Sequence, residues 1–238
     1  MREEVQLLQR RPWAELGGGD FGWLKAKHHF SVAGQGNPRH GPLGSLIVWN
    51  DDEIAPGTGF PLHGHRDVEI ITYVRQGTVA HEDNLGNVGR IEAGDIQVMS
   101  AGTGIRHAEF NPGREPLKIY QIWIRPRDAG GRPRWESRPF PTAGQSGRLV
   151  VLASGFVESE SALSIRADAR VFGAVLALGD TVTHSLAGGR HGYLALAAGA
   201  VTVNGMRLHC GDGIAISGNS DIQIGALQRS ELVLVDTA

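Results

Sequence analysis

The sequence predicts an all-β protein with few short helices, organised as two strand-rich halves. Glycine provides 34 of the 238 residues, about twice its average share, and it follows no fixed period. Such an excess suits many tight turns between short strands. Short runs of alternating apolar and polar residues support strands, whereas long helical periodicity is absent. This length fits either one large β domain or two domains of about 110–130 residues.

The N-terminal segment is the best candidate for a helix. Glu3 to Leu16 could form a short helix or an irregular arm. The first residues, MREEVQLLQRRPW, contain no apolar core of signal-peptide length. No stretch approaches the roughly 18 apolar residues of a membrane span. We therefore expect a cytoplasmic protein that does not associate with membranes.

Strands and turns run from about residue 22 to residue 125 and carry two pairs of metal-ligating residues. His63 and His65 stand one residue apart, and His107 and Glu109 repeat that spacing further along the chain. In a β-strand, residues i and i+2 point the same way, so two neighbouring strands bring all four side chains together. Three imidazoles and one carboxylate suit a divalent transition metal and leave positions of an octahedral ion open.

The residues around both pairs fit strands and turns. Residues 57–77 read GTGFPLHGHRDVEIITYVRQG, with an apolar-rich run at 68–74 after the first pair. Residues 94–112 read GDIQVMSAGTGIRHAEFNP, where residues 94–95 form a turn and 96–99 alternate like a strand.

A segment rich in Pro, Gly and Arg follows at residues 125–148 and has the composition of a linker between domains. We expect its arginines to be solvated: Arg125, Arg127, Arg132, Arg134 and Arg138. The first, metal-binding barrel is placed at residues 1–135 and the second at 136–238.

The second half repeats the rhythm of the first without its ligands. Asn204-Gly205 is a hairpin turn between strands, and Gly211-Asp212 matches the turn before the second pair. Only His184 stands where a histidine pair would fall, so we predict a degenerate repeat that binds no metal. Cys210 is the only cysteine, which excludes an intrachain disulfide; a structural thiol is the default and a redox sensor the alternative.

Residues 57–77 resemble the first sequence motif of the cupin superfamily. Gly57, the His63 and His65 pair, Glu69 and Gly77 all have the spacing of that motif. The resemblance implies a fold of two tandem cupin barrels of the jelly-roll type, a bicupin.

Residues 94–112 resemble the second cupin motif more loosely. Ser100 replaces the usual proline, and two extra residues separate Gly102 from His107. With these departures, residues 57–112 are similar to the pirin family of bicupins, including its quercetinase-like bacterial members. The resemblance also implies that the second barrel lacks a metal.

The carboxylate ligand depends on the branch of the superfamily. Most metal-binding cupins take it from the first motif, which is Glu69 here, whereas pirins take it from the second, which is Glu109. Four residues of strand span about 13 Å and carry Glu69 away from His65, whereas Glu109 is one pleat from His107. We therefore predict that the ligands are His63, His65, His107 and Glu109. Glu69 is expected to support the site or the structure.

The other histidines have no comparable setting, and a lone strand histidine is usually hydrogen-bonded or solvated. They are His28, His29, His40, His184, His191 and His209. His81 is the exception, because it follows the first motif closely and could line the same pocket.

The pirin resemblance implies ring-opening dioxygenation of flavonols such as quercetin, with release of carbon monoxide. The substrates would be a small planar aromatic molecule, the flavonol, and O2. Glu109 would be the catalytic residue, taking the proton of the flavonol 3-hydroxyl at the metal. We expect one divalent transition metal, with Fe(II) first and Mn, Ni, Co, Cu or Zn as alternatives.

Pirins also include metal-dependent regulators that act through protein partners, with the oxidation state of iron as a switch. A redox-sensing regulator is therefore the alternative, and a non-redox cupin such as an isomerase is a third reading. The net charge of −2 offers no field that attracts nucleic acid directly. A chain that already contains two barrels can be a monomer, which is the state we expect.

Overall fold

The computed structural model describes residues 7–32, 34–139, 147–156, 162–218 and 220–238. Within these residues the chain forms 22 strands and one short 3-10 helix, η1 (Trp13–Glu15). The prediction of an all-β fold is confirmed. Among the described residues, no helix is long and apolar enough to cross a membrane.

The first barrel consists of a seven-stranded and a four-stranded sheet. The large sheet has the order β12-β9-β6-β11-β4-β3-β2, and the small sheet has the order β5-β10-β7-β8. The strands are β2 (Gly17–Asp20), β3 (Leu24–His28), β4 (Leu46–Ile54), β5 (Gly59–His65), β6 (Glu69–Gln76), β7 (Thr78–Asp83), β8 (Val88–Glu92), β9 (Asp95–Ser100), β10 (Ile105–Phe110), β11 (Leu117–Ile124) and β12 (Arg134–Pro139).

The second barrel repeats this division. Its large sheet has the order β1-β20-β17-β22-β15-β13-β14 and its small sheet the order β16-β21-β18-β19. The strands are β1 (Leu7–Arg11), β13 (Val150–Ser154), β14 (Leu163–Ser164), β15 (Ala169–Leu176), β16 (Thr181–Leu186), β17 (His191–Ala198), β18 (Ala200–Val203), β19 (Met206–His209), β20 (Gly213–Ser217), β21 (Ser220–Ala226) and β22 (Ser230–Thr237). Asn204 and Gly205 join β18 to β19 with φ angles of 45° and 82°, the positive values that a tight hairpin requires.

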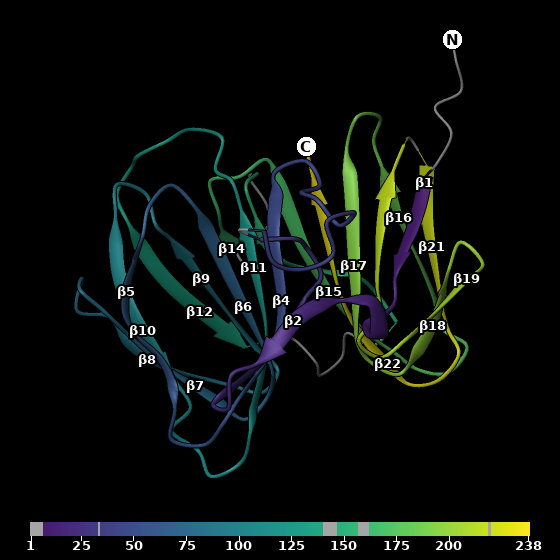
Figure 1. Ribbon diagram of the computed structural model, residues 1–238. Coiled ribbons are helices and arrows are strands. Elements are labelled where there is room, and N and C mark those ends of the chain that lie inside the picture. The colour runs from purple at the N-terminus through teal and green to yellow at the C-terminus, as the bar shows by residue number, and fades with distance from the viewer. Residues whose placement is uncertain (1–6, 33, 140–146, 157–161, 219) are drawn as a thin grey trace.

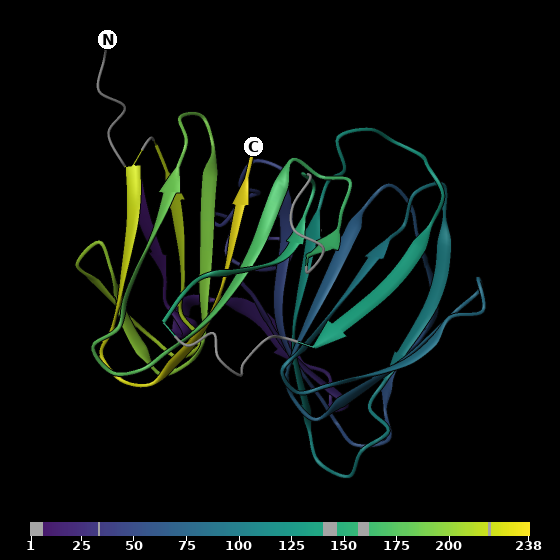
Figure 2. The ribbon, with the colours of Figure 1, turned by 180° about the vertical axis from the view of Figure 1, so that it is seen from behind.

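The two large sheets face each other in the middle of the molecule, and the small sheets lie on the outside (Figures 1 and 2). One hydrophobic core spans both halves and includes Trp49 and Tyr120 from the first barrel and Tyr193 from the second. The Tyr193 hydroxyl lies 2.8 Å from Nδ1 of buried His29. The apolar contact is thus supported by a hydrogen bond between the barrels.

The N-terminal segment differs from the helix or irregular arm that we expected. Residues 7–11 form β1, which pairs antiparallel with β20 of the second barrel. Arg10 forms an ion pair with Asp212 at 2.7 Å, and Leu8 packs against the core of the second barrel. A free edge of the second sheet accepts this strand, and neighbouring residues in the sequence do not encode such long-range pairing.

The expected linker also contains a strand. β12 pairs with β9 and crosses residue 135, while residues 140–146 of the segment lie outside the described part. Its arginines are exposed, as expected, at positions 125, 127, 132 and 138, whereas Arg134 is half-buried. Two of them also form hydrogen bonds. Arg127 donates to the carbonyl of Gly155 at 2.8 Å. Arg134 donates to Ser100 Oγ at 3.3 Å and to the carbonyl of Ser164.

Candidate metal centre

The two pairs of predicted ligands lie on adjacent strands of the outer small sheet. β10 pairs antiparallel with β5, and this register sets His107 directly opposite His63 and Ile105 opposite His65. Residues Ile105, His107 and Glu109 of β10 are buried and alternate with more exposed neighbours. The period of two in a strand therefore turns both pairs toward the barrel interior.

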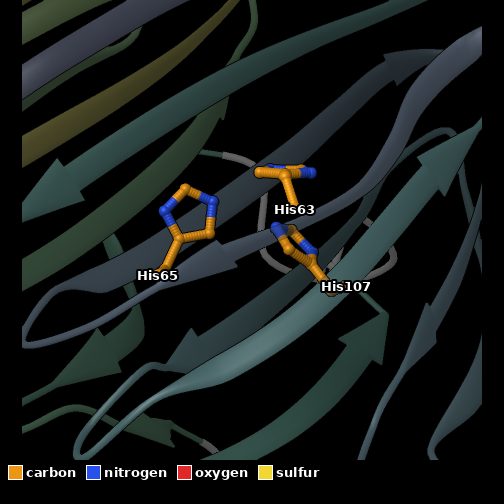
Figure 3. A group of neighbouring side chains, drawn as sticks. All are labelled: His63, His65 and His107. Atoms are coloured by element: carbon orange, nitrogen blue, oxygen red, sulfur yellow. The ribbon is translucent and has the colours of Figure 1, made fainter.

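His63, His65 and His107 form a compact group of imidazoles (Figure 3). One nitrogen from each ring lies within 4.8 Å of the others. The ring centroids of His63 and His107 are 4.5 Å apart, and those of His65 and His107 are 5.1 Å apart. Metal–nitrogen bonds are about 2.1 Å long. Small side-chain rotations would bring one nitrogen of each ring to this distance from a single ion.

Hydrogen bonding and burial leave ring nitrogens of His63 and His107 available to a metal. Nδ1 of His63 donates to the carbonyl of Pro61 at 2.8 Å, because a carbonyl only accepts, so Nε2 is the nitrogen left to bind a metal. Both ring nitrogens of His107 are buried without a hydrogen-bond partner among the described residues. Buried polar atoms normally have partners, so the donor set fits a metal ion.

Burial also favours the neutral imidazoles that a metal requires. It lowers the pKa of His107 to about 3, and the nearby His63, His65 and His81 add to the effect. Burial, with His63 next, lowers the pKa of His65 to about 4. Protons therefore compete weakly for these two nitrogens at neutral pH.

Glu109 lies in a second group with His107, and its third member is His81. The carboxylate accepts hydrogen bonds from Gln97 Nε2, from Gln121 Nε2 at 2.8 Å and from Thr72 Oγ1 at 3.4 Å. Burial nevertheless raises the pKa of Glu109 to about 7, and the three donors only partly oppose this increase.

Two tryptophans fix the amides that hold Glu109. Trp135 donates from Nε1 to Gln97 Oε1 at 2.8 Å, and Trp123 donates to Gln121 Oε1 at 3.3 Å. With each amide oxygen occupied by an indole N–H, the amide nitrogen faces the carboxylate. The large sheet thus presents an oriented pair of donors to the candidate site.

Glu69 belongs to neither histidine group among the described residues. Its carboxylate is buried and accepts a hydrogen bond from Ser100 Oγ at 2.6 Å. Ser100 is the residue that replaces the usual proline of the second motif. The geometry therefore gives Glu69 a structural partner and leaves Glu109 as the carboxylate beside a histidine.

A surface pocket of about 330 Å³ borders one member of the group. Its lining includes His65, Arg66 and Arg106. The Trp123 ring meets His65 edge-on at 5.0 Å. His65 therefore contacts an aromatic ring and borders a pocket that carries positive charge.

A larger cavity of about 640 Å³ lies elsewhere, lined by Trp13, Lys27, Arg75 and the exposed Cys210 among others. None of the four predicted ligands lines it. Volume alone does not identify a functional site, and the smaller pocket is the one that contacts a predicted ligand, His65.

In the second barrel, His184 is engaged in a structural contact. Its Nε2 lies 2.9 Å from Asp236 Oδ2, and its ring packs against Phe172. No group of metal-ligating side chains occurs in the described residues of this half.

The polar residues that hold Glu109 were not among the predicted site residues. Thr72, Gln97 and Gln121 occupy matching positions on β6, β9 and β11, since Thr72 pairs with both Gln97 and Gln121. Each is a polar residue between two apolar or aromatic neighbours in its strand. That isolated polarity was the signal available in the sequence, because buried polar side chains require partners.

Comparison with known proteins agrees with this architecture. Residues 10–124 match the family model described as Pirin, and residues 151–237 match the model described as Quercetinase C-terminal cupin domain. A "Pirin-like protein" of Caulobacter vibrioides is 57% identical over 232 residues, covering 98% of this chain and 100% of the relative. A protein of Escherichia coli K12 named "Quercetin 2,3-dioxygenase" is 40% identical over 231 residues, covering 97% of this chain and 98% of the relative.

Solved structures give the same result. The structure of YhhW from Escherichia coli matches with a TM-score of 0.91 at 39% identity and covers 98% of each chain. A structure of bacterial pirin YhhW in complex with nickel(II) matches with a TM-score of 0.90 at 38% identity, covering 97% of this chain and 99% of that chain.

Proposed function

Because this chain belongs to the pirin family of bicupins, we propose that it is a metal-dependent dioxygenase that opens the ring of flavonols such as quercetin. The observation that carries the proposal is the convergence of His63, His65 and His107, whose donor nitrogens lie within 4.8 Å of one another. A relative with 40% identity carries the name of this activity. A structural relative in complex with nickel(II) supports binding of a divalent metal.

We assign His63, His65, His107 and Glu109 as the ligands of one divalent transition metal. When bound, the metal supplies a Lewis-acid centre for the flavonol oxygen and for dioxygen chemistry. Fe(II) is our proposed native ion, because imidazole and carboxylate ligands with open positions suit non-haem iron.

Glu109 is assigned as the catalytic base that takes the proton of the flavonol 3-hydroxyl. In the metal-free protein burial raises its pKa to about 7, so the buried carboxylate can accept a proton near neutral pH when it is not held by the metal. Gln97 and Gln121 donate to the carboxylate and keep it oriented. The same carboxyl can return the proton once the ring has opened.

The pocket beside His65 suits an ionisable aromatic substrate. Arg66 and Arg106 line this pocket, and their positive charge would favour a phenolate over its neutral form. We further propose that the protein works as a cytoplasmic monomer and does not bind nucleic acid directly.

The test is an absorbance assay of flavonol turnover by metal-loaded protein, in air and under nitrogen. We expect loss of the flavonol band in air only, near-complete loss of activity in Glu109→Gln, and little change in Glu69→Gln. Glu69→Gln is a matched control, since it also removes a buried carboxylate from the first barrel.

Two outcomes would contradict the proposal. Tight metal binding without turnover of any flavonol would favour the redox-sensing regulator. Turnover that survives Glu109→Gln but not Glu69→Gln would move the catalytic carboxylate to the first motif.

A further inference from the structure

His81 is a buried histidine that faces the candidate metal centre and has no role in the function proposed above. It lies on β7 directly opposite Glu109 of β10. Its Nε2 is 3.4 Å from Asp83 Oδ2, and its ring stacks on Trp135 at 4.8 Å with an interplanar angle of 11°. Its Nδ1 is buried and lacks a hydrogen-bond partner in the part of the chain described here.

His81, His107 and Glu109 together offer three donor atoms to a metal ion. One donor atom from each lies within 4.8 Å of the other two, and all three residues are buried. Two imidazoles and one carboxylate are a ligand set that non-haem Fe(II) uses. Among the described residues, the carboxylate of Glu109 has only neutral donors around it, so a buried cation would neutralise its charge.

We propose that His81, His107 and Glu109 form an inner binding position for the divalent transition metal, behind the outer position made by His63, His65 and His107, and that Glu109 can serve as the carboxylate ligand of either position. The inference rests on the proposed metal centre and adds a second place for its ion. His107 belongs to both groups, and both of its ring nitrogens are buried without a partner among the described residues. One imidazole can thus serve either position.

The two positions differ in what reaches the ion. His65 borders a surface pocket, and His63 and His65 are half-buried, so substrate can reach the outer position. The inner ligands are all buried, so an ion held there is shielded from solvent. Two dications sharing one imidazole would repel strongly, and we therefore expect one ion per chain, distributed between the positions.

Asp83 orients the His81 ring. Because Asp83 accepts a hydrogen bond from Nε2 of His81, Nδ1 is the ring nitrogen left to bind a metal, an arrangement that carboxylates commonly provide for ligating histidines. Asp83 is itself fixed by the backbone N–H groups of Leu85 and Asn87 at 2.9 and 3.1 Å.

Co(II) binding by a double variant, His63→Ala with His65→Ala, tests the inner position. This variant removes two outer ligands and keeps all three inner ones. We expect it to retain about one Co(II) per chain with weaker affinity. Adding His81→Phe, which preserves the aromatic stack on Trp135, should weaken the remaining binding about tenfold or more. His81→Phe alone should leave one Co(II) per chain, held at the outer position.

The inner position is refuted if the folded double variant binds no Co(II), or binds it equally well with and without His81. If the unaltered protein binds no Co(II), the metal centre of the proposed function fails instead. Near-UV circular dichroism reports whether each variant is folded.

Should the double variant not fold, the single variant His65→Ala gives a second test. Zn(II) titration with ¹⁵N-labelled histidine should shift the ring resonances of His81. Bound Zn(II) that leaves the His81 resonances unchanged would overturn the inner position.

Discussion

Replacing Glu109 with glutamine should change how the stability of the metal-free protein depends on pH. Burial raises the pKa of Glu109 from 4.5 to about 7. The folded state therefore holds a proton that the unfolded state releases between these values. In this window the free energy of unfolding falls as pH rises, and the loss is complete above pH 7. The change in pKa corresponds to about 3 kcal/mol at full effect.

The measurable quantity is the difference in unfolding free energy between the unaltered protein and Glu109→Gln. Between pH 5 and pH 8 this difference should move in favour of the variant by about 2–3 kcal/mol. At pH 5 the variant should be the less stable of the two, because the amide groups of Gln97 and Gln121 both present N–H donors to position 109. Other buried acids, such as Asp52 with its pKa raised to about 8, titrate in both proteins.

Urea denaturation of chelator-treated protein, followed by tryptophan fluorescence at both pH values, provides the two free energies. A difference that stays constant within about 0.5 kcal/mol from pH 5 to pH 8 would refute the buried, proton-binding carboxyl. The same would follow if the variant lost stability relative to the unaltered protein as pH rises.

Three further predictions concern the centre and the contact between barrels. His107→Ala should remove most bound metal while the circular dichroism spectrum stays native, because strands and core supply the stability; full metal occupancy in the folded variant would exclude His107 as a ligand. Ordinary histidines would make the affinity of a three-histidine site fall about three decades per pH unit below pH 6.5. The pKa values of His65 and His107 are lowered to about 4 and 3, while that of Glu109 is raised. We therefore expect the affinity to fall by at most about two decades per pH unit between pH 5 and 6.5 in competition titrations, and a slope of three would show that at least one of these two rings titrates in that range. Tyr193→Phe should lower the free energy of unfolding by about 1–3 kcal/mol, because it leaves buried Nδ1 of His29 without its 2.8 Å partner; a loss below about 0.3 kcal/mol would mean that the contact between barrels is not stabilising.

The histidine group could be predicted because strand geometry is periodic. An i, i+2 spacing on two strands requires only that the strands be neighbours, and β5 and β10 pair with His63 opposite His107. The same reasoning left Glu69 distant from the histidines, and the structure gives it Ser100 as a partner.

The surroundings of Glu109 could not be predicted in the same way. Gln97 and Gln121 lie on strands far apart in the sequence, and they meet only because β6 lies between β9 and β11 in the large sheet. The inner group likewise depends on β7 setting His81 opposite Glu109. Pairing between distant strands is set by the whole fold and is not written in local patterns.

The same limit explains the two segments whose structure differed from expectation. The segments that form β1 and β12 read as a helical arm and a linker, yet each completes the edge of a seven-stranded sheet. Unpaired backbone groups at a sheet edge attract any extended segment within reach. Composition alone does not reveal that the edge is available.

The stoichiometry of the reaction tests the central proposal most directly. Protein loaded with Fe(II) would be incubated with quercetin under a known amount of dioxygen, and carbon monoxide would be quantified in the headspace. Ring-opening dioxygenation predicts about one carbon monoxide released and one dioxygen consumed per flavonol, with none of either in His107→Ala. Loss of quercetin without carbon monoxide, or equal release by His107→Ala, would contradict catalysis at this centre.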